Sequence, residues 1–219
     1  MPIRGVIFDL DGTLLDTIED ITEASNRVYG ARGLAPFSIE EMKKLVGEGA
    51  EELVRKVFAA RGRPPLSEAD MAALIGDYRR EYEACWRVHS RPYPGIPELV
   101  SELARRGART AVLSNKSQTF TSVMTETLLP LHAFDIVRGA RPGIPLKPDP
   151  APALAIASDL GLSPAACAFV GDTSIDMTTA RAAGMFAVGA LWGFRTAEEL
   201  RSSGADALIA APADLLGLL

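Results

Sequence analysis

The sequence GVIFDLDGT at residues 5–13 decides the fold of this chain of 219 residues. Its first four residues form a short apolar run, which is typical of a buried strand. The run ends abruptly at Asp9 and Asp11, and the glycine that follows them permits a tight turn. The pattern therefore predicts a buried strand whose carboxyl end carries two closely spaced carboxylates.

A long helical region follows this strand. Apolar residues recur at helical spacing over residues 16–88, and no convincing strand interrupts them. Ser38 and Glu41 have the spacing of a capping box, which marks the start of one of these helices. We expect residues 16–88 to form an all-helical domain.

From Tyr93 onward, short apolar runs alternate with helical segments. The predicted strands lie at residues 110–113, 134–137, 167–170, 186–188 and 207–209. This alternation predicts a parallel sheet that is covered by helices on both faces. We therefore expect an α/β fold with a Rossmann-like core formed by residues 1–15 and 89–219, into which the helical domain is inserted after the first strand.

Composition limits the possible partners. The formal net charge is −5, which argues against nucleic acid or an anionic membrane as the main partner. The longest apolar stretch, residues 153–170, is broken by polar residues and a proline, so it fails as a membrane span. Cys85 and Cys167 are too few for a disulfide framework or a zinc site. We expect a cytoplasmic protein without a signal peptide, either a monomer or a homodimer.

Polar side chains gather where the predicted strands end. These residues are Asp9, Asp11, Ser114, Asn115, Asp172 and Asp176, together with Lys147 just before a predicted helix. Ligands of open parallel sheets bind outside the carboxyl ends of the strands. We therefore expect these side chains to meet at one edge of the sheet.

The chemistry of this set indicates a metal ion and a phosphate. Several carboxylates in one cleft need a cation, and oxygen ligands that leave room for water and phosphate favour Mg²⁺. The two histidines, His89 and His132, lie outside the set, which argues against zinc and against a histidine nucleophile. A carboxylate is then the best nucleophile, and a serine hydroxyl and a lysine suit phosphate oxygens.

The spacing of Asp9 and Asp11 fits a division of labour between two carboxylates. One must be ionised to attack phosphorus, and the other must give a proton to the leaving alkoxide and then take one from water. Gly12 and Thr13 would let backbone N–H groups approach the phosphoryl oxygens.

These residues resemble the haloacid dehalogenase superfamily at all four of its motifs. The matching segments are DLDGTL at residues 9–14, Ser114-Asn115, Lys147-Pro148, and GDTSID at residues 171–176. The helical insertion resembles the C1 cap of that superfamily. Within it, the chain is similar to the phosphoglycolate phosphatases, through VGEGA at residues 46–50 and LWGFR at residues 191–195 among other segments.

The resemblance implies a role for each matching residue. Asp9 would be the nucleophile and a Mg²⁺ ligand, and Asp11 the general acid/base, with its backbone carbonyl on the metal. Asp172 would bind the metal, whereas Asp176 would act through a metal-bound water or orient Lys147. Ser114, Asn115 and Lys147 would hold the phosphoryl group, in addition to the backbone of Gly12 and Thr13 that the spacing already suggests.

The expected function is therefore that of a Mg²⁺-dependent phosphatase for a small phosphorylated metabolite, resembling 2-phosphoglycolate, with an aspartyl-phosphate intermediate. Gly47, Glu48 and Gly49 would form a specificity loop of the cap, or only end one helix and begin the next. Lys116 is given no role. Pyrophosphate, sugar phosphates and nucleotides remain alternative substrates, and a phosphomutase or a non-catalytic binding protein remains an alternative function.

Overall fold

The computed structural model describes residues 2–130 and 134–219, so that His132 lies outside the described residues. The chain divides into two compact units. Unit 1 consists of Met1–Leu15 and Pro92–Leu219, and unit 2 consists of Asp16–Arg91. The chain thus returns to unit 1 at Pro92, slightly after the boundary that the sequence predicts at residue 89.

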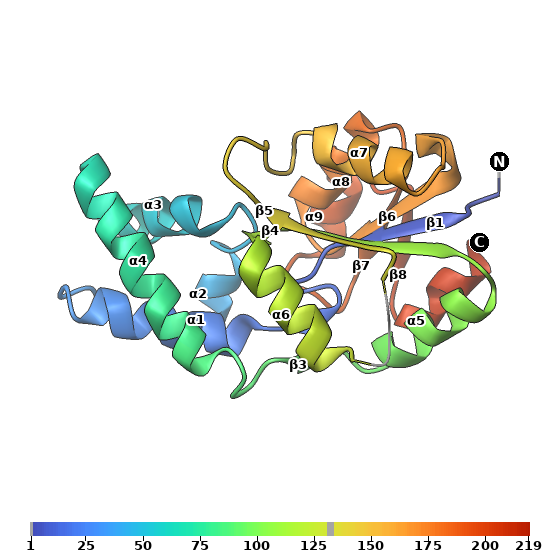
Figure 1. Cartoon of the computed structure of the whole chain (residues 1–219). Coiled ribbons are helices and arrows are strands. Elements are labelled where there is room, and N and C mark those ends of the chain that lie inside the picture. The colour runs from blue at the N-terminus through green and yellow to red at the C-terminus, as the bar shows by residue number, and fades with distance from the viewer. Residues whose placement is uncertain (1, 131–133) are drawn as a thin grey trace. The chain divides into compact units, whose positions relative to one another are not determined.

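Unit 1 is built on a parallel sheet (Figure 1). Its strand order within the described residues is β5-β4-β1-β6-β7-β8, and every pair is parallel. These strands are β1 (Gly5–Phe8), β4 (Arg109–Ser117), β5 (Ile136–Ala140), β6 (Cys167–Gly171), β7 (Phe186–Ala190) and β8 (Ala207–Ile209). Counted in chain order without the two-residue strands β2 and β3, the order is 3-2-1-4-5-6, that of a doubly wound Rossmann sheet. The predicted α/β core is confirmed.

Helices cover both faces of this sheet. In Figure 1, α7 and α8 lie on one face, and α5 and α6 lie on the other. The helical segments of unit 1 are α5 (Ile96–Arg105), α6 (Gln118–Leu128), α7 (Ala151–Asp159), η1 (Pro164–Ala166), α8 (Ser174–Ala182), α9 (Ala197–Ser202) and η2 (Pro212–Gly217). All residues of β1 and β6 are buried, which explains why both strands are apolar runs without alternation.

The strand order reverses at β1, and this reversal positions the site. β4 pairs with one edge of β1 and β6 with the other. The chain runs from β1 to β4 and β5 on one side, and then crosses through α7 to β6 on the other side. A crevice forms outside the strand ends at such a switch point. β4 extends to Ser117, beyond the predicted end at residue 113, and its register shifts between Leu113 and Ser117. Ser114 and Asn115 therefore belong to the end of the strand itself.

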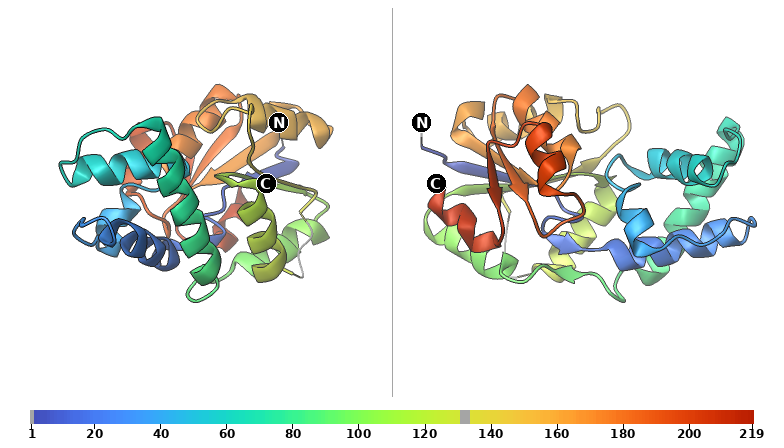
Figure 2. Two further views of the ribbon diagram at one scale, coloured as in Figure 1. Left: turned by 60° about the vertical axis from the view of Figure 1, so that its left-hand side comes forward. Right: turned by 180° about the vertical axis from the view of Figure 1, so that it is seen from behind.

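Unit 2 is helical, as its periodicity predicts (Figure 2). It contains α1 (Ile18–Gly30), α2 (Ile39–Lys43), α3 (Ala50–Ala60) and α4 (Glu68–Cys85). Helix α1 packs against α2 and α4, and α3 packs against α4. The predicted capping box begins α2, where the Glu41 N–H donates to Ser38 Oγ at 3.2 Å and the Ser38 N–H donates to Glu41 Oε2 at 2.8 Å.

Two further expectations can be compared with the described residues. Among them, no helix is both long enough and apolar enough to cross a membrane. Cys85 and Cys167 are buried and form no disulfide, and burial raises the pKa of both thiols.

A buried carboxylate in the first helix of unit 2 accepts hydrogen bonds from the last residues of that unit. Asp20 in α1 has no exposed surface. Its Oδ1 accepts the His89 N–H at 3.0 Å, and its Oδ2 accepts the N–H and the hydroxyl of Ser90 at 2.8 and 2.7 Å. The chain is thereby tied to unit 2 up to residue 90, just before the short strand β3 (Arg91–Pro92), which pairs with β2 (Leu15–Asp16).

We expect Asp20→Ala to lower the free energy of unfolding by about 3 kcal/mol, because several donors at His89 and Ser90 lose their acceptor while remaining shielded from water. The matched control is Glu19→Ala. Glu19 is half exposed and lies 3.4 Å from His89 Nδ1, so its loss should change stability by less than about 0.5 kcal/mol. Urea unfolding followed by helical circular dichroism measures both, and equal effects would contradict the role of Asp20.

Candidate active site

Three buried carboxylates meet at the switch point of the sheet. Asp9 follows β1, Asp172 follows β6, and Asp176 lies in the first turn of α8. Each of them offers an oxygen, and these atoms all lie within 4.8 Å of one another. All three side chains are buried. The structure therefore brings together residues that are more than 160 positions apart in the chain.

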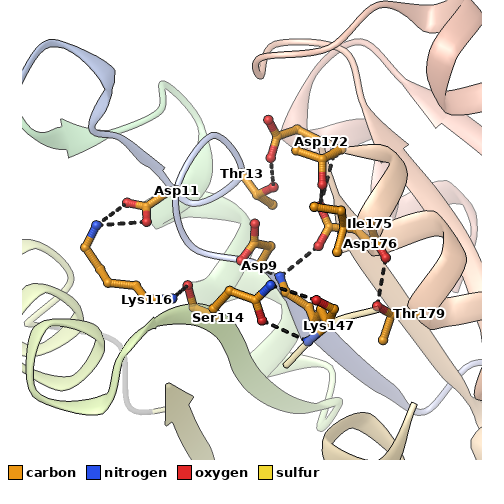
Figure 3. Close-up of polar contacts among 12 residues, drawn as sticks. Asp9, Asp11, Thr13, Ser114, Lys116, Lys147, Asp172, Ile175, Asp176 and Thr179 are labelled. Atoms are coloured by element: carbon orange, nitrogen blue, oxygen red, sulfur yellow. Dashed lines mark hydrogen bonds and ion pairs between the residues drawn. The ribbon is translucent and has the colours of Figure 1, made fainter. Parts of the chain in front are cut away.

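Lys147 supplies positive charge to this cluster (Figure 3). Its Nζ lies 2.7 Å from Asp9 Oδ1 and 2.8 Å from Asp176 Oδ1, and its side chain is 2% exposed. Three carboxylates and one ammonium group leave a formal charge of about −2 in a buried place. Without a further cation, this charge raises the free energy of the folded state.

The pKa values reflect this excess of negative charge. Burial raises the pKa of Asp9 to about 7, with the charge of Lys147 opposing the rise and that of Asp176 adding to it. Burial and the charges of Asp176 and Asp9 raise the pKa of Asp172 well above its usual value. Burial alone would lower the pKa of Lys147, but the two neighbouring carboxylates raise it above its usual value.

The donor set fits a hard divalent cation. All candidate ligands are carboxylate oxygens, and a charge of +2 would balance the cluster. Asp9 and Asp172 are the residues best placed to hold it. Asp176 is already engaged, because its Oδ1 accepts from Lys147 and its Oδ2 accepts the N–H and the hydroxyl of Thr173 at 3.0 and 2.7 Å. This geometry fits the second of its two predicted roles, that of orienting Lys147.

Asp172 is held by hydrogen bonds from two distant segments. Its Oδ1 accepts the Thr13 hydroxyl at 2.9 Å, and its Oδ2 accepts the Phe194 N–H at 2.8 Å. The Trp192 indole N–H also donates to the Thr13 carbonyl at 3.0 Å. From the sequence alone, the segment LWGFR at residues 191–195 is only a mark of resemblance, whereas in the structure this segment supports the carboxylate of Asp172.

Two glycines allow the backbone to approach this carboxylate. A Cβ at Gly12 would lie 2.3 Å from Asp172 Oδ2, and a Cβ at Gly193 would lie 2.2 Å from Asp172 Cβ. Gly12 also has a φ of 87°, which few side chains tolerate. Any larger residue at either position must displace Asp172.

Asp11 does not join the carboxylate cluster. Figure 3 shows its carboxylate turned toward Lys116, away from Asp172 and Asp176. The Lys116 Nζ lies 2.8 Å from Asp11 Oδ2. The sequence gives no hint of this pair, because nothing in its spacing distinguishes Lys116 from a surface lysine after a strand.

The predicted phosphate-binding residues have different environments. Ser114 is buried at the end of β4, and its Oγ accepts the Lys116 N–H at 3.2 Å. Asn115 instead supports Lys147. Its Nδ2 donates to the Lys147 carbonyl and its Oδ1 accepts the Lys147 N–H, both at 2.9 Å. The amide of Asn115 thus fixes the lysine backbone rather than offering itself fully to a phosphate.

The backbone N–H groups of Gly12 and Thr13 are also engaged, contrary to the expectation that they face a phosphate. The Gly12 N–H donates to the Leu15 carbonyl at 2.8 Å, and the Thr13 N–H to the Leu10 carbonyl at 3.3 Å. These two hydrogen bonds stabilise the tight turn that leads into β2. What the two residues contribute to the site is space and the Thr13 hydroxyl.

The candidate specificity loop lies in unit 2. Gly47, Glu48 and Gly49 connect α2 to α3, and Gly49 precedes the first residue of α3 with a φ of 88°. Glu48 forms an ion pair with Lys56. A part in substrate selection stays a prediction for these three residues.

We expect Gly193→Ala to weaken the binding of Mg²⁺ by about 10- to 100-fold, because its Cβ would push Asp172 out of position. Gly30→Ala is the matched control, since a Cβ at this position in α1 meets nothing within 4 Å. Calorimetric titration of each variant with Mg²⁺ measures the affinity. Wild-type affinity in Gly193→Ala would contradict the proposed support of Asp172.

Metal binding should also depend on pH. Protons compete with a cation for Asp9, whose pKa is raised to about 7, and for Asp172. Mg²⁺ should therefore bind roughly tenfold more tightly at about pH 8 than at about pH 6. Without metal the sign is opposite, because a raised pKa in the folded state contributes stability at low pH that is lost as the pH rises through about 7.

Thermal unfolding with and without Mg²⁺ at both pH values measures this effect. The stabilisation by Mg²⁺ should be larger at the higher pH, and Asp9→Asn should reduce both the stabilisation and its pH dependence. An equal or larger stabilisation at the lower pH would argue against a cation on these carboxylates.

Comparison with known proteins agrees with this geometry. The sequence profile of the haloacid dehalogenase-like hydrolases matches residues 6–190. The chain is 32% identical over 209 residues to a phosphoglycolate phosphatase of Nitrosospira multiformis, covering 95% of this chain and 92% of the relative. It is 30% identical over 220 residues to an N-acetylmuramic acid 6-phosphate phosphatase of Pseudomonas aeruginosa, covering 100% and 96%.

A solved structure extends the comparison to the fold. A candidate phosphoglycolate phosphatase from Lactobacillus delbrueckii subsp. bulgaricus is 28% identical and superposes with a TM-score of 0.91. The match covers 98% of this chain and 97% of that one, so it includes the helical insertion as well as the sheet. The chain belongs to the haloacid dehalogenase-like hydrolase family.

Proposed function

We propose that the chain hydrolyses 2-phosphoglycolate or a similarly small phosphate monoester, with Mg²⁺ and through a phosphorylated Asp9. Its family and the phosphatases among its relatives make it a phosphoric monoester hydrolase. The observation that carries the mechanism is the buried contact of Asp9 with Lys147 inside a cluster that includes Asp172. This arrangement provides a nucleophile, an ammonium group for the phosphoryl oxygens and carboxylate ligands for a metal ion.

In the first half of the reaction, a carboxylate oxygen of Asp9 attacks phosphorus. A bond forms between that oxygen and phosphorus while the bond from phosphorus to the alkoxide of the substrate breaks. Asp11 gives its proton to the departing alkoxide, which leaves as an alcohol. The ammonium group of Lys147 and the hydroxyl of Ser114 stabilise the negative charge on the phosphoryl oxygens.

The second half regenerates the enzyme. Water attacks the phosphorus of phosphorylated Asp9, and Asp11, now ionised, removes a proton from that water. The bond between phosphorus and Asp9 breaks, which releases inorganic phosphate and the free carboxylate. Asp11 ends the cycle protonated, as it began, so atoms and charges balance.

The metal site follows from the donor set. Asp9, Asp172 and the backbone carbonyl of Asp11 would hold Mg²⁺, an ion that accepts few protein oxygens and keeps room for phosphate. When bound, it supplies positive charge opposite the transferring phosphoryl group. Asp176 and Asn115 act indirectly, since one holds the ammonium group and the other the backbone of Lys147.

The relatives agree on phosphatase chemistry more closely than on the identity of the substrate. Relatives of nearly equal identity, 32% and 30%, are named for phosphoglycolate and for a phosphorylated amino sugar. We propose the smaller ester because further relatives that cover nearly the whole chain, such as one from Aquifex aeolicus, are also phosphoglycolate phosphatases. The loop of Gly47, Glu48 and Gly49 is proposed to select among esters.

A panel of phosphate compounds with Mg²⁺ tests the function. The panel contains 2-phosphoglycolate, N-acetylmuramic acid 6-phosphate, glucose 6-phosphate, pyrophosphate and p-nitrophenyl phosphate. We expect the highest kcat/KM for 2-phosphoglycolate and a loss of more than about 10³-fold on every compound in Asp9→Asn. The control is Asp159→Asn, a half-exposed carboxylate of unit 1 paired with Arg138, which should retain wild-type rates.

Each outcome has a distinct meaning. Normal turnover in Asp9→Asn would overturn the nucleophile assignment. Preference for another compound would overturn the proposed substrate while leaving the chemistry intact. Undiminished hydrolysis in excess chelator would overturn the requirement for a metal ion.

A further inference from the structure

A second lysine, besides Lys147, forms an ion pair with a carboxylate of the site. Lys116 lies near the end of β4, and its Nζ donates to both oxygens of Asp11, at 3.0 Å to Oδ1 and 2.8 Å to Oδ2. The two side chains are only 10% and 13% exposed. A partly buried pair with both oxygens engaged restricts a carboxylate far more than a surface ion pair does.

The backbone that carries Lys116 is itself fixed. Its N–H donates to Ser114 Oγ at 3.2 Å, and its carbonyl accepts the Thr121 hydroxyl at 3.1 Å. A Cβ at Gly139 in β5 would lie 2.7 Å from this carbonyl oxygen, so the neighbouring strand passes unusually close. The lysine therefore extends from an anchored base at the sheet edge.

The two lysines form ion pairs with different carboxylates. Lys147 contacts Asp9 and Asp176, whereas Lys116 contacts Asp11. Figure 3 shows the ammonium groups of the two lysines on different sides of the site. Lys116 can thus direct the carboxylate of Asp11 while Lys147 remains in contact with Asp9 and Asp176.

Resting on the phosphatase mechanism proposed above, we propose that Lys116 is a positioning residue for the acid/base Asp11. Its ammonium group keeps the side chain of Asp11 in one orientation in both halves of the reaction. It donates to both oxygens of the ionised form that faces the attacking water, and to the carbonyl oxygen of the protonated form, whose hydroxyl then faces the leaving oxygen. An aspartate without such a partner can occupy several staggered rotamers. A displacement of about 1 Å in a catalytic group can reduce the rate by about 100-fold.

This role predicts a dependence on the leaving group. Departure of an alkoxide needs the proton of Asp11, whereas p-nitrophenolate is a stable anion that leaves with little help. The kcat/KM reports on the steps from free enzyme through cleavage of the ester. Misplacing Asp11 should therefore affect alkyl phosphates selectively.

The experiment compares three esters in Lys116→Met: ethyl phosphate, 2-phosphoglycolate and p-nitrophenyl phosphate. We expect kcat/KM to fall about 10- to 100-fold for both alkyl esters and less than about threefold for p-nitrophenyl phosphate. Lys116→Arg, which keeps a positive charge, should recover part of the loss. Arg181→Met removes an exposed cation of unit 1 and should leave all three rates unchanged.

Two results would overturn the proposal. An equal loss on all three esters would mean that Lys116 binds the phosphoryl group, and a loss on 2-phosphoglycolate alone would mean that it binds the substrate's carboxylate. If Lys116→Met has a reduced thermal stability, the ratio of the alkyl to the aryl ester still decides, because loss of folded protein lowers all rates equally.

A double-mutant cycle separates this proposal from the proposed function. Asp11→Asn alone should show the same selective loss, and adding Lys116→Met to it should cost less than about twofold more. If Asp11→Asn spares the alkyl esters, the acid/base assignment fails. If Asp11→Asn is selective but Lys116→Met is not, or if the two losses multiply, only the role of Lys116 fails.

Discussion

The burial of three carboxylates at one point of the sheet is the constraint that the rest of the structure satisfies. Like charges in a medium that solvates them poorly are tolerated only next to compensating cations. Lys147 provides one such cation, and Asn115 holds its backbone so that the ammonium group stays between Asp9 and Asp176. The remaining negative charge suits a divalent cation, whose ligands would be carboxylate oxygens of this cluster.

The sequence was sufficient to predict the fold and to group the three buried carboxylates with Lys147. The aspartates and Ser114-Asn115 follow apolar runs, and parallel strands place their carboxyl ends on one edge. Lys147 precedes a predicted helix, and the start of that helix belongs at the same edge. Asp9, Asp172, Asp176 and Lys147 could therefore be grouped without coordinates. The helical insertion was also predictable, because its periodicity differs from that of the sheet over a long stretch.

The finer contacts could not be read from the sequence, for identifiable physical reasons. Nothing in chain spacing shows whether Lys116 points inward, because this depends on the irregular register at the end of β4. The contact of Phe194 with Asp172 joins residues across a loop that has no periodic pattern. Likewise, the N–H of Gly12 is used by a turn that ends in a two-residue strand, which is too short to leave a hydrophobic signature.

The pairing of β2 with β3 has an evolutionary consequence. The chain leaves unit 1 and comes back to it through neighbouring hydrogen-bonded strands, so the ends of the inserted segment start from adjacent points. Insertions with closely spaced ends disturb a host fold little. The helical segment can therefore differ in length or composition between related proteins without displacing the strands of unit 1.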